Sequence, residues 1–162
     1  MIGLDASGKT TLLYTLRLSE VNTSFLTIGL TYETAQNHKL SIISWDIGLS
    51  DRSSLYNQFY ENAEGIIFLV DSNDRSRINY AREELQRFIY NEKLRLLPLL
   101  IYANKQDIIN SMSAGEIADR LGIQSNEKSC RVQSSCVITG YGIIEGLEWI
   151  NKAIKNKDND AR

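Results

Sequence analysis

The chain is short of cysteine, of charge of one sign and of long apolar runs, and each shortage excludes a class of protein. Its two cysteines, Cys130 and Cys136, have a spacing that fits neither a CxxC metal site nor a disulfide framework, which indicates a reduced, intracellular protein. The formal net charge of −2 provides no basic surface for nucleic acid. No apolar run could span a bilayer, and no signal peptide or CaaX terminus is present. We therefore expect no nucleic-acid partner and no membrane anchor in this sequence.

The chain also lacks any feature that would divide it. No linker, internal repeat or low-complexity segment interrupts the 162 residues, of which 43% are hydrophobic. That content is sufficient for a packed core, and the length is typical of one domain. We predict a single domain over residues 1–162.

What is present begins with residues 3–10, which read G-x-x-x-x-G-K-T and are followed by a helix-like stretch over residues 11–18. The glycines of such a loop let backbone N–H groups turn toward phosphate oxygens, Lys9 can reach the outer phosphates, and the Thr10 hydroxyl suits Mg²⁺. The alternative is a coincidental glycine loop, because the pattern is specific only between a strand and a helix. Only Met1 and Ile2 precede the loop, which is too few for the expected strand. The motif predicts a nucleotide-binding protein.

A second motif, N-K-x-D at residues 104–107, follows the apolar, strand-like run 99–103. The Asp107 carboxylate can accept hydrogen bonds from both the ring N1–H and the exocyclic amine of guanine, a pair of donors that adenine does not offer. Asn104 would brace the surrounding loops, and the Lys105 stem would cover the face of the base. The alternative is a polar turn after a strand. The position at the carboxyl end of a strand, after a phosphate loop, favours guanine recognition.

Two further residues lie between these motifs. Thr27 lies in a polar stretch after the first helix, and Asp46 ends the apolar strand 40–45 within a W-D-x-G sequence. In P-loop GTPases a threonine and an aspartate at such places complete the Mg²⁺ shell and sense the γ-phosphate. Taken alone, either could be an ordinary loop residue.

The order of elements indicates an α/β fold. Apolar runs over residues 65–71 and 97–103 alternate with helix-like stretches, and an alternating strand over residues 130–136 precedes the last helix. This order predicts a doubly wound, mostly parallel sheet with helices on both faces. A hairpin of residues 31–34 and 40–45 adds one antiparallel edge strand. The predicted helical core residues are Ile78, Ala81, Leu85, Phe88, Ile89, Ile117, Leu121, Ile143, Leu147, Ile150 and Ile154.

On these motifs the chain resembles the Arf and Arf-like family of small GTPases, whose fold is that of the P-loop NTPases. The resemblance also rests on V-D-S-N-D-R at residues 70–75 and G-L-E-W at residues 146–149, and it covers nearly the whole chain. It implies a GDP/GTP switch in intracellular membrane traffic, with Mg²⁺ as cofactor. The implied nucleotide-binding residues are Asp5, Ala6, Ser7, Gly8, Lys9, Thr10, Thr11, Asn104, Lys105, Asp107, Cys136 and Val137. The implied Mg²⁺ ligands are Thr10, Thr27 and Asp46.

The chain departs from this family where the γ-phosphate is sensed. The family reads W-D-x-G-G-Q-D, whereas residues 45–51 read W-D-I-G-L-S-D, so Leu49 replaces a glycine and Ser50 replaces the water-orienting glutamine. Ser50 occupies the catalytic position, but its side chain is too short to orient the attacking water, so we expect weak hydrolysis. At the base site Val137 replaces an alanine whose N–H meets the guanine carbonyl, and the backbone donor survives that change.

The N-terminus is the other departure, because the sequence shows neither the family's amphipathic N-terminal helix nor its myristoylated glycine. The strand that leads to the phosphate loop is central in doubly wound folds, so its loss would leave neighbouring strands with unpaired N–H and C=O groups. We therefore expect that the chain is shortened at its front, or that residues outside this sequence supply the strand. The expected location is cytoplasmic, and peripheral at endomembranes if a longer N-terminus exists.

Three functions remain open from the sequence. The first is a regulatory GTPase that acts with an exchange factor, an activator and effectors, as the family resemblance implies. The second is a pseudo-GTPase that binds guanine nucleotide without hydrolysing it and serves as a binding module or scaffold, which Leu49 and Ser50 favour. The third is a P-loop kinase, which we disfavour because such kinases have no use for an N-K-x-D motif.

Overall fold

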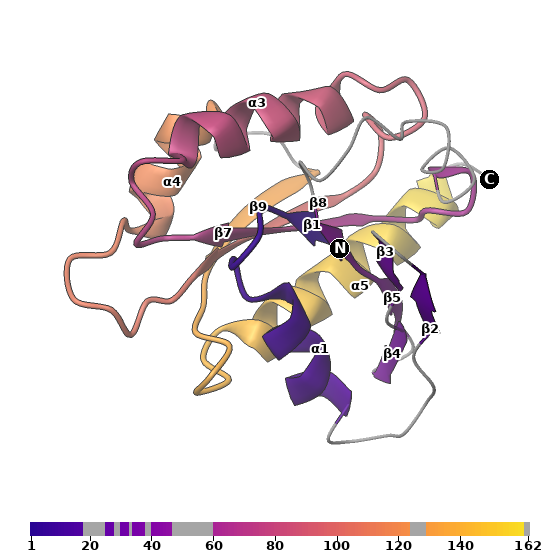
Figure 1. Ribbon diagram of the computed structural model, residues 1–162. Coiled ribbons are helices and arrows are strands. Elements are labelled where there is room, and N and C mark those ends of the chain that lie inside the picture. The colour runs from indigo at the N-terminus through magenta and orange to yellow at the C-terminus, as the bar shows by residue number, and fades with distance from the viewer. Residues whose placement is uncertain are drawn as a thin grey trace.

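The computed structural model describes residues 1–17, 25–27, 30–32, 34–37, 40–46, 60–123 and 129–160. The strands are β1 (Ile2–Gly3), β2 (Phe25–Thr27), β3 (Leu30–Tyr32), β4 (Thr34–Asn37), β5 (Leu40–Ile43), β6 (Trp45–Asp46), β7 (Ile66–Asp71), β8 (Leu99–Asn104) and β9 (Cys130–Ser134). The helices are α1 (Lys9–Arg17), α3 (Ile78–Ile89), α4 (Ala114–Leu121) and α5 (Ile143–Asp160). Figure 1 shows α3 and α4 over one face of the central sheet and α1 and α5 over the other.

A five-stranded sheet in the order β6-β1-β7-β8-β9 forms the centre of the structure. Every pairing within it is parallel. The strands β7 and β8 pair from Ile66↔Leu99 to Asp71↔Asn104, and both are nearly continuous apolar runs because helices bury them on two faces. The predicted α/β, doubly wound fold is therefore confirmed. In such folds the functional loops leave the carboxyl ends of the strands.

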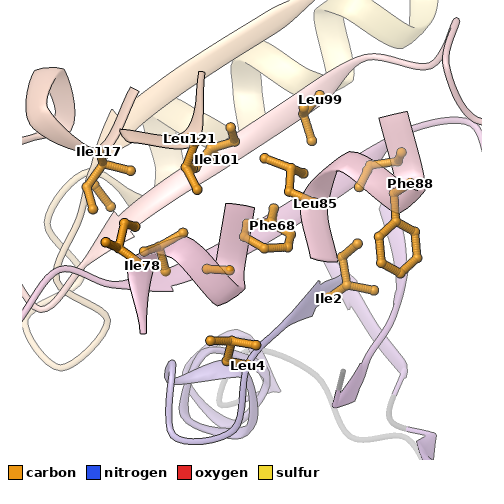
Figure 2. Packing of buried hydrophobic residues seen from close by; sticks show 14 of the residues in the cluster. Ile2, Leu4, Phe68, Ile78, Leu85, Phe88, Leu99, Ile101, Ile117 and Leu121 are labelled. Atoms are coloured by element: carbon orange, nitrogen blue, oxygen red, sulfur yellow. The ribbon is translucent and has the colours of Figure 1, made fainter. Parts of the chain in front are cut away.

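One layer of the core lies between the sheet and the helices α3 and α4. Phe68 of β7 and Ile101 of β8 are fully buried, as is Ile117 of α4, and Leu85 of α3 is 1% exposed. Figure 2 shows these side chains within one apolar cluster. Burial of a side chain of this size contributes about 1.5 to 3 kcal/mol. The predicted core residues on this side are confirmed: Ile78, Ala81, Leu85, Phe88, Ile117 and Leu121 are buried and Ile89 is partly buried.

The second core layer lies between the sheet and the helices α1 and α5. Tyr102 of β8 is fully buried there, and its hydroxyl donates to the Ile143 carbonyl at 2.6 Å. A Cβ at Gly146 would lie 2.5 Å from the Tyr102 hydroxyl, so glycine at this position lets α5 lie against the ring. The predicted residues of this helix are confirmed as well: Ile143, Leu147 and Ile150 are buried and Ile154 is partly buried.

A short strand, β1, precedes the phosphate loop, although the sequence offered too few residues to predict one; the expected shortening at the front of the chain stays a prediction. Within β1, Ile2 pairs with Trp45 of β6 on one side and with Phe68 of β7 on the other. Gly3 also pairs on both sides, with Asp46 and with Leu69. A Cβ at Gly3 would lie 2.4 Å from the Leu69 carbonyl oxygen, so the close approach of the two strands requires glycine. These two residues therefore occupy the central position of the sheet, between β6 and β7.

The predicted hairpin is present, with a different boundary and a different place in the sheet. Its strands are β4 and β5, which pair antiparallel from Thr34↔Ile43 to Asn37↔Leu40. Among the described residues these two strands form a sheet of their own, and the chain continues from β5 through Ser44 into β6 at the edge of the central sheet. A second antiparallel pair, β2 with β3, includes Leu30–Tyr32, which the sequence placed partly in the first hairpin.

Candidate functional site

The phosphate loop connects the carboxyl end of β1 to the N-terminus of α1, which is the context that its motif requires. The Leu12 N–H donates to the Gly8 carbonyl at 2.9 Å, so the helical hydrogen bonds begin at the end of the loop. Gly8 has a φ of 104°, and a Cβ there would lie 2.5 Å from Asn104 Nδ2. Ala6 has a φ of 59°, in the left-handed region, and turns the loop between Asp5 and Ser7. The loop therefore has the tight curvature that brings a backbone close to phosphate oxygens.

The Lys9 ammonium lies inside the curve of this loop. The residue is 4% exposed, and its Nζ donates to the carbonyls of Gly3 at 2.9 Å and Leu4 at 2.6 Å. A third bond runs to Ser7 Oγ at 3.3 Å. Because the loop's own oxygens hold the ammonium in place, its charge is positioned where an anion in the loop would meet it.

Asn104 at the end of β8 joins the phosphate loop to the loop after β9. Its Nδ2 donates to the Ser7 carbonyl at 2.9 Å, and its Oδ1 accepts from the Val137 N–H at 3.1 Å. The side chain is buried, with the residue 2% exposed, and both ends of its amide have partners. Ser7 and Val137 are 130 positions apart in the sequence, and both bind this one side chain. This agrees with the bracing role predicted for Asn104.

Asp107, the predicted reader of guanine, is exposed. Its Oδ1 accepts from the Cys136 thiol at 3.1 Å, and a carboxylate has capacity for further donors on both oxygens. Cys136 itself is buried and carries a free thiol. The structure thus brings the two predicted base-site residues together, through a contact that the spacing of the cysteines did not reveal.

Gln106, the unspecified position of the N-K-x-D motif, fixes the base loop to its neighbours. Its Nε2 donates to Ser72 Oγ at 3.0 Å and to the Met112 carbonyl at 2.9 Å, while its N–H donates to the Ser135 carbonyl at 3.1 Å. Sequence reasoning gave this residue no role, because a glutamine after a strand has no distinctive pattern. Its bonds hold the backbone on either side of Lys105 and Asp107.

Lys105 pairs with Asp71 at the end of β7, with 2.6 Å between Nζ and Oδ2. The side chains are 31% and 16% exposed, respectively. Lys105 has a φ of 67°, a left-handed conformation that is uncommon outside glycine. The ion pair holds the lysine ammonium at the end of β7, and the cover over a base stays a prediction. Asp71 is a contributor that sequence reasoning missed.

The Val137 N–H already has a hydrogen-bond partner within the protein. We expected this donor to meet the guanine carbonyl, whereas the structure gives it to Asn104 Oδ1. The valine side chain is buried in the α1 and α5 layer of the core, which fixes the position of the N–H. A guanine carbonyl would therefore share this donor with Asn104.

Of the predicted Mg²⁺ ligands, only Thr10 can be placed, and it is exposed in the first turn of α1 beside the exposed Thr11. Thr27 ends β2 and Asp46 ends β6, but their side chains lie outside the described part of the structure. Ser50, the predicted catalytic position, also lies outside it. In the described ranges no group of three or more histidine, cysteine or acidic residues could hold a metal ion. The accessible Thr10 hydroxyl at the loop fits a metal that is held mainly by phosphate and water.

Arg77, directly before α3, reaches the phosphate loop. Its Nη1 lies 2.7 Å from Asp5 Oδ1, and its Nη2 donates to the Asp5 carbonyl at 3.5 Å. On its other side its Nε pairs with Asp74. Asp74 also accepts from the Ser76 hydroxyl at 2.7 Å and from the Arg77 N–H at 3.1 Å. Burial favours the neutral carboxyl group, but these hydrogen bonds outweigh it and lower the pKa of Asp74.

The variant Asp74→Asn should lose stability at neutral pH and little in acid. Because the folded-state pKa of Asp74 is lowered, its charge stabilises the folded state above the unfolded-state pKa, and this contribution disappears as pH falls through the folded-state value. The free energies of unfolding of the two proteins should therefore differ at about pH 7 and converge toward about pH 2. Urea unfolding followed by circular dichroism measures this. A constant difference across the pH range would contradict it.

Comparison with known families adds one finding to this geometry. The model of the ADP-ribosylation factor family, Arf, matches residues 1–154 of the chain. The matched range includes the phosphate loop, the N-K-x-D loop and the loop that carries Cys136 and Val137. Within the described residues no helix has both the length and the apolar character needed to cross a membrane.

Proposed function

The chain belongs to the ADP-ribosylation factor family and is thus a small GTPase of Arf type that binds guanine nucleotide; from this premise we propose a switch that alternates between GDP and GTP with weak intrinsic hydrolysis. The observation that carries the proposal is the Asn104 bridge, which holds Ser7 of the phosphate loop and Val137 of the base loops in one unit. Asp107 accepts a hydrogen bond from the thiol of Cys136, the residue directly before Val137. The phosphate and base motifs are therefore assembled as one site, as a nucleotide requires.

Each motif has a role in binding. The Asp107 carboxylate accepts from guanine N1–H and from the exocyclic amine, while the Lys9 ammonium and the turned backbone of the loop bind the phosphates. Mg²⁺, when bound, neutralises phosphate charge, with Thr10, Thr27 and Asp46 as its proposed ligands. Lys105 covers the base, and its ion pair with Asp71 limits the positions that its stem can take. Exchange factors, activators and effectors, and a role in membrane traffic from a cytoplasmic location, belong to the same proposal.

The test is the identity of the nucleotide carried by the purified protein. Denaturation followed by chromatography reports the base, the number of phosphates and the occupancy together. GDP is the expected form, because its phosphates meet the loop of residues 3–10 without any contact to Leu49. Adenine nucleotide, or an empty site that added GDP does not fill, would contradict the proposal.

Hydrolysis should stay slow when Ser50→Gln is introduced alone and recover when Leu49→Gly accompanies it. The position before the missing glutamine must present its N–H to the γ-phosphate through a turn that glycine makes easily, and a leucine there raises the free energy of closure by about 1 to 2 kcal/mol. GTP preference should therefore differ about tenfold between the single and double variants. A double-mutant cycle on GTP affinity and single-turnover rate measures the coupling. Full recovery with Ser50→Gln alone would show that the leucine is harmless.

A non-hydrolysing binding module is the second candidate, and the substitutions at Leu49 and Ser50 favour it. The two candidates share the binding site and differ in turnover. Single-turnover release of phosphate from bound GTP separates them, with and without added activator protein. Slow but measurable release supports the switch, whereas bound GTP that persists unchanged supports the module.

A further inference from the structure

The phosphate loop is held from two sides, and the nucleotide motifs account for only one of them. Asn104 fixes the loop at Ser7. On the opposite side of Ala6, the guanidinium of Arg77 donates to the side-chain carboxylate and to the backbone carbonyl of Asp5. Ala6 lies between the two attachments in a left-handed conformation, with a φ of 59°. A residue with a Cβ adopts that conformation only where its surroundings hold it. The two attachments together supply that restraint.

The Arg77 contact lies beside a small pocket between the loop and α3. Leu4, Asp5 and Ser7 line it on the loop side, while Asp74 and Arg77 line it on the side of α3. Leu4, Ile78 and Ala81 also line this space and belong to one buried apolar cluster. On the polar side, the guanidinium joins the loop to the segment before α3, with Asp74 bound to Nε and Asp5 bound to Nη1. Asp74 is itself fixed by the Ser76 hydroxyl and the Arg77 N–H.

The exposure of this pair separates a role in the loop from a role in overall stability. The side chains of Arg77 and Asp5 are 37% and 66% exposed. Ion pairs this open to solvent add little to the free energy of folding. A contact of this strength can still change the population of one loop conformation by up to about fivefold.

We propose that Arg77 is a positioning residue that holds the phosphate loop in its nucleotide-binding conformation, an inference that rests on the proposed guanine-nucleotide function. It touches no part of the nucleotide and acts through Asp5. Loss of Arg77 loosens the Asp5–Ala6 turn and shortens the lifetime of bound GDP.

Arg75 provides a matched control. It lies in the same loop, carries the same charge and forms an ion pair of similar length, 2.6 Å from Glu116 Oε1, but it does not contact the phosphate loop. The experiment measures dissociation of a fluorescent GDP analogue from the full chain in excess unlabelled GDP and Mg²⁺. We expect dissociation about threefold to fivefold faster in Arg77→Ala and unchanged in Arg75→Ala. The thermal unfolding midpoints of the two variants should be similar.

Two further variants keep the test independent of folding. Arg77→Lys keeps the charge but lacks the planar fork whose Nε and Nη groups reach Asp74 and Asp5, so its rate should be intermediate. Asp5→Ala should speed dissociation as Arg77→Ala does, and combining them should add little, because the two residues act through one contact. Equal rates in the two arginine variants, or fully additive effects of Asp5→Ala and Arg77→Ala, would overturn the inference alone. A wild-type protein that fails to bind the analogue would overturn the proposed function as well.

Discussion

Asp107→Asn should lower the affinity for GDP about 100-fold and raise the affinity for xanthosine diphosphate by a similar factor. In the proposed site the carboxylate accepts from two guanine donors, whereas an amide of the same shape offers one acceptor and one donor. Xanthine carries a carbonyl where guanine has its amine, so the amide donor finds a partner there. Asp107 is exposed and its Oδ1 is bound by the Cys136 thiol, so the substitution should leave the fold intact.

Titration of fluorescent guanosine and xanthosine diphosphates against both proteins gives the two affinities. Asp119→Asn is a matched control, since it makes the same chemical change at an exposed position of α4 outside the site. It should leave both affinities unchanged. A variant at position 107 that still prefers guanine would remove Asp107 from base recognition.

Gly142→Ala should destabilise the protein by about 3 to 4 kcal/mol, whereas Gly140→Ala should cost about 1 to 2 kcal/mol. Both glycines have left-handed backbones, with φ of 72° and 80°, so the strain from a Cβ is similar. The difference is space. A Cβ at Gly142 would lie 2.0 Å from the Ser134 carbonyl oxygen, whereas none of the atoms around Gly140 comes within 4 Å of such a Cβ. Backbone at the end of β9 cannot yield as a flexible side chain can.

Urea unfolding followed by circular dichroism measures both changes, with Gly140→Ala as the control for strain alone. Gly142 lies in the turn between the Cys136 and Val137 loop and α5, so the same substitution should weaken GDP binding. Equal losses in the two variants would show that the clash relaxes and that backbone conformation alone sets the cost.

Local patterns in the sequence predicted most of the architecture. The apolar run 65–71 corresponds to β7 (Ile66–Asp71), because a strand buried on both faces needs no polar residue along its length. The stripe on α3 follows from helical periodicity in the same local way. In the site, the role of Asn104 was also predictable, since the motif places it at the carboxyl end of a strand where two loops meet.

Contacts between distant segments were not predictable. Arg77 and Asp5 are 72 positions apart, and no periodicity relates them. The central β1 was missed because two residues carry no strand pattern, and its place depends on partners elsewhere in the chain. The last strand was predicted to alternate over residues 130–136, but β9 ends at Ser134 and is half-buried throughout. As an edge strand it is only partly covered, so its two faces do not differ sharply.

The Asn104 amide joins the phosphate loop to the longest ladder of the central sheet. β7 and β8 pair at six positions, and both strands are buried on two faces. Amide hydrogens in these two strands should therefore exchange with solvent only on global unfolding, whereas those of loops exchange through smaller openings. Because Asn104 ends β8 and holds the Ser7 carbonyl, a bound nucleotide would connect the phosphate loop to the most protected part of the sheet, and the slowing of exchange on binding should be greatest in the loop and α1.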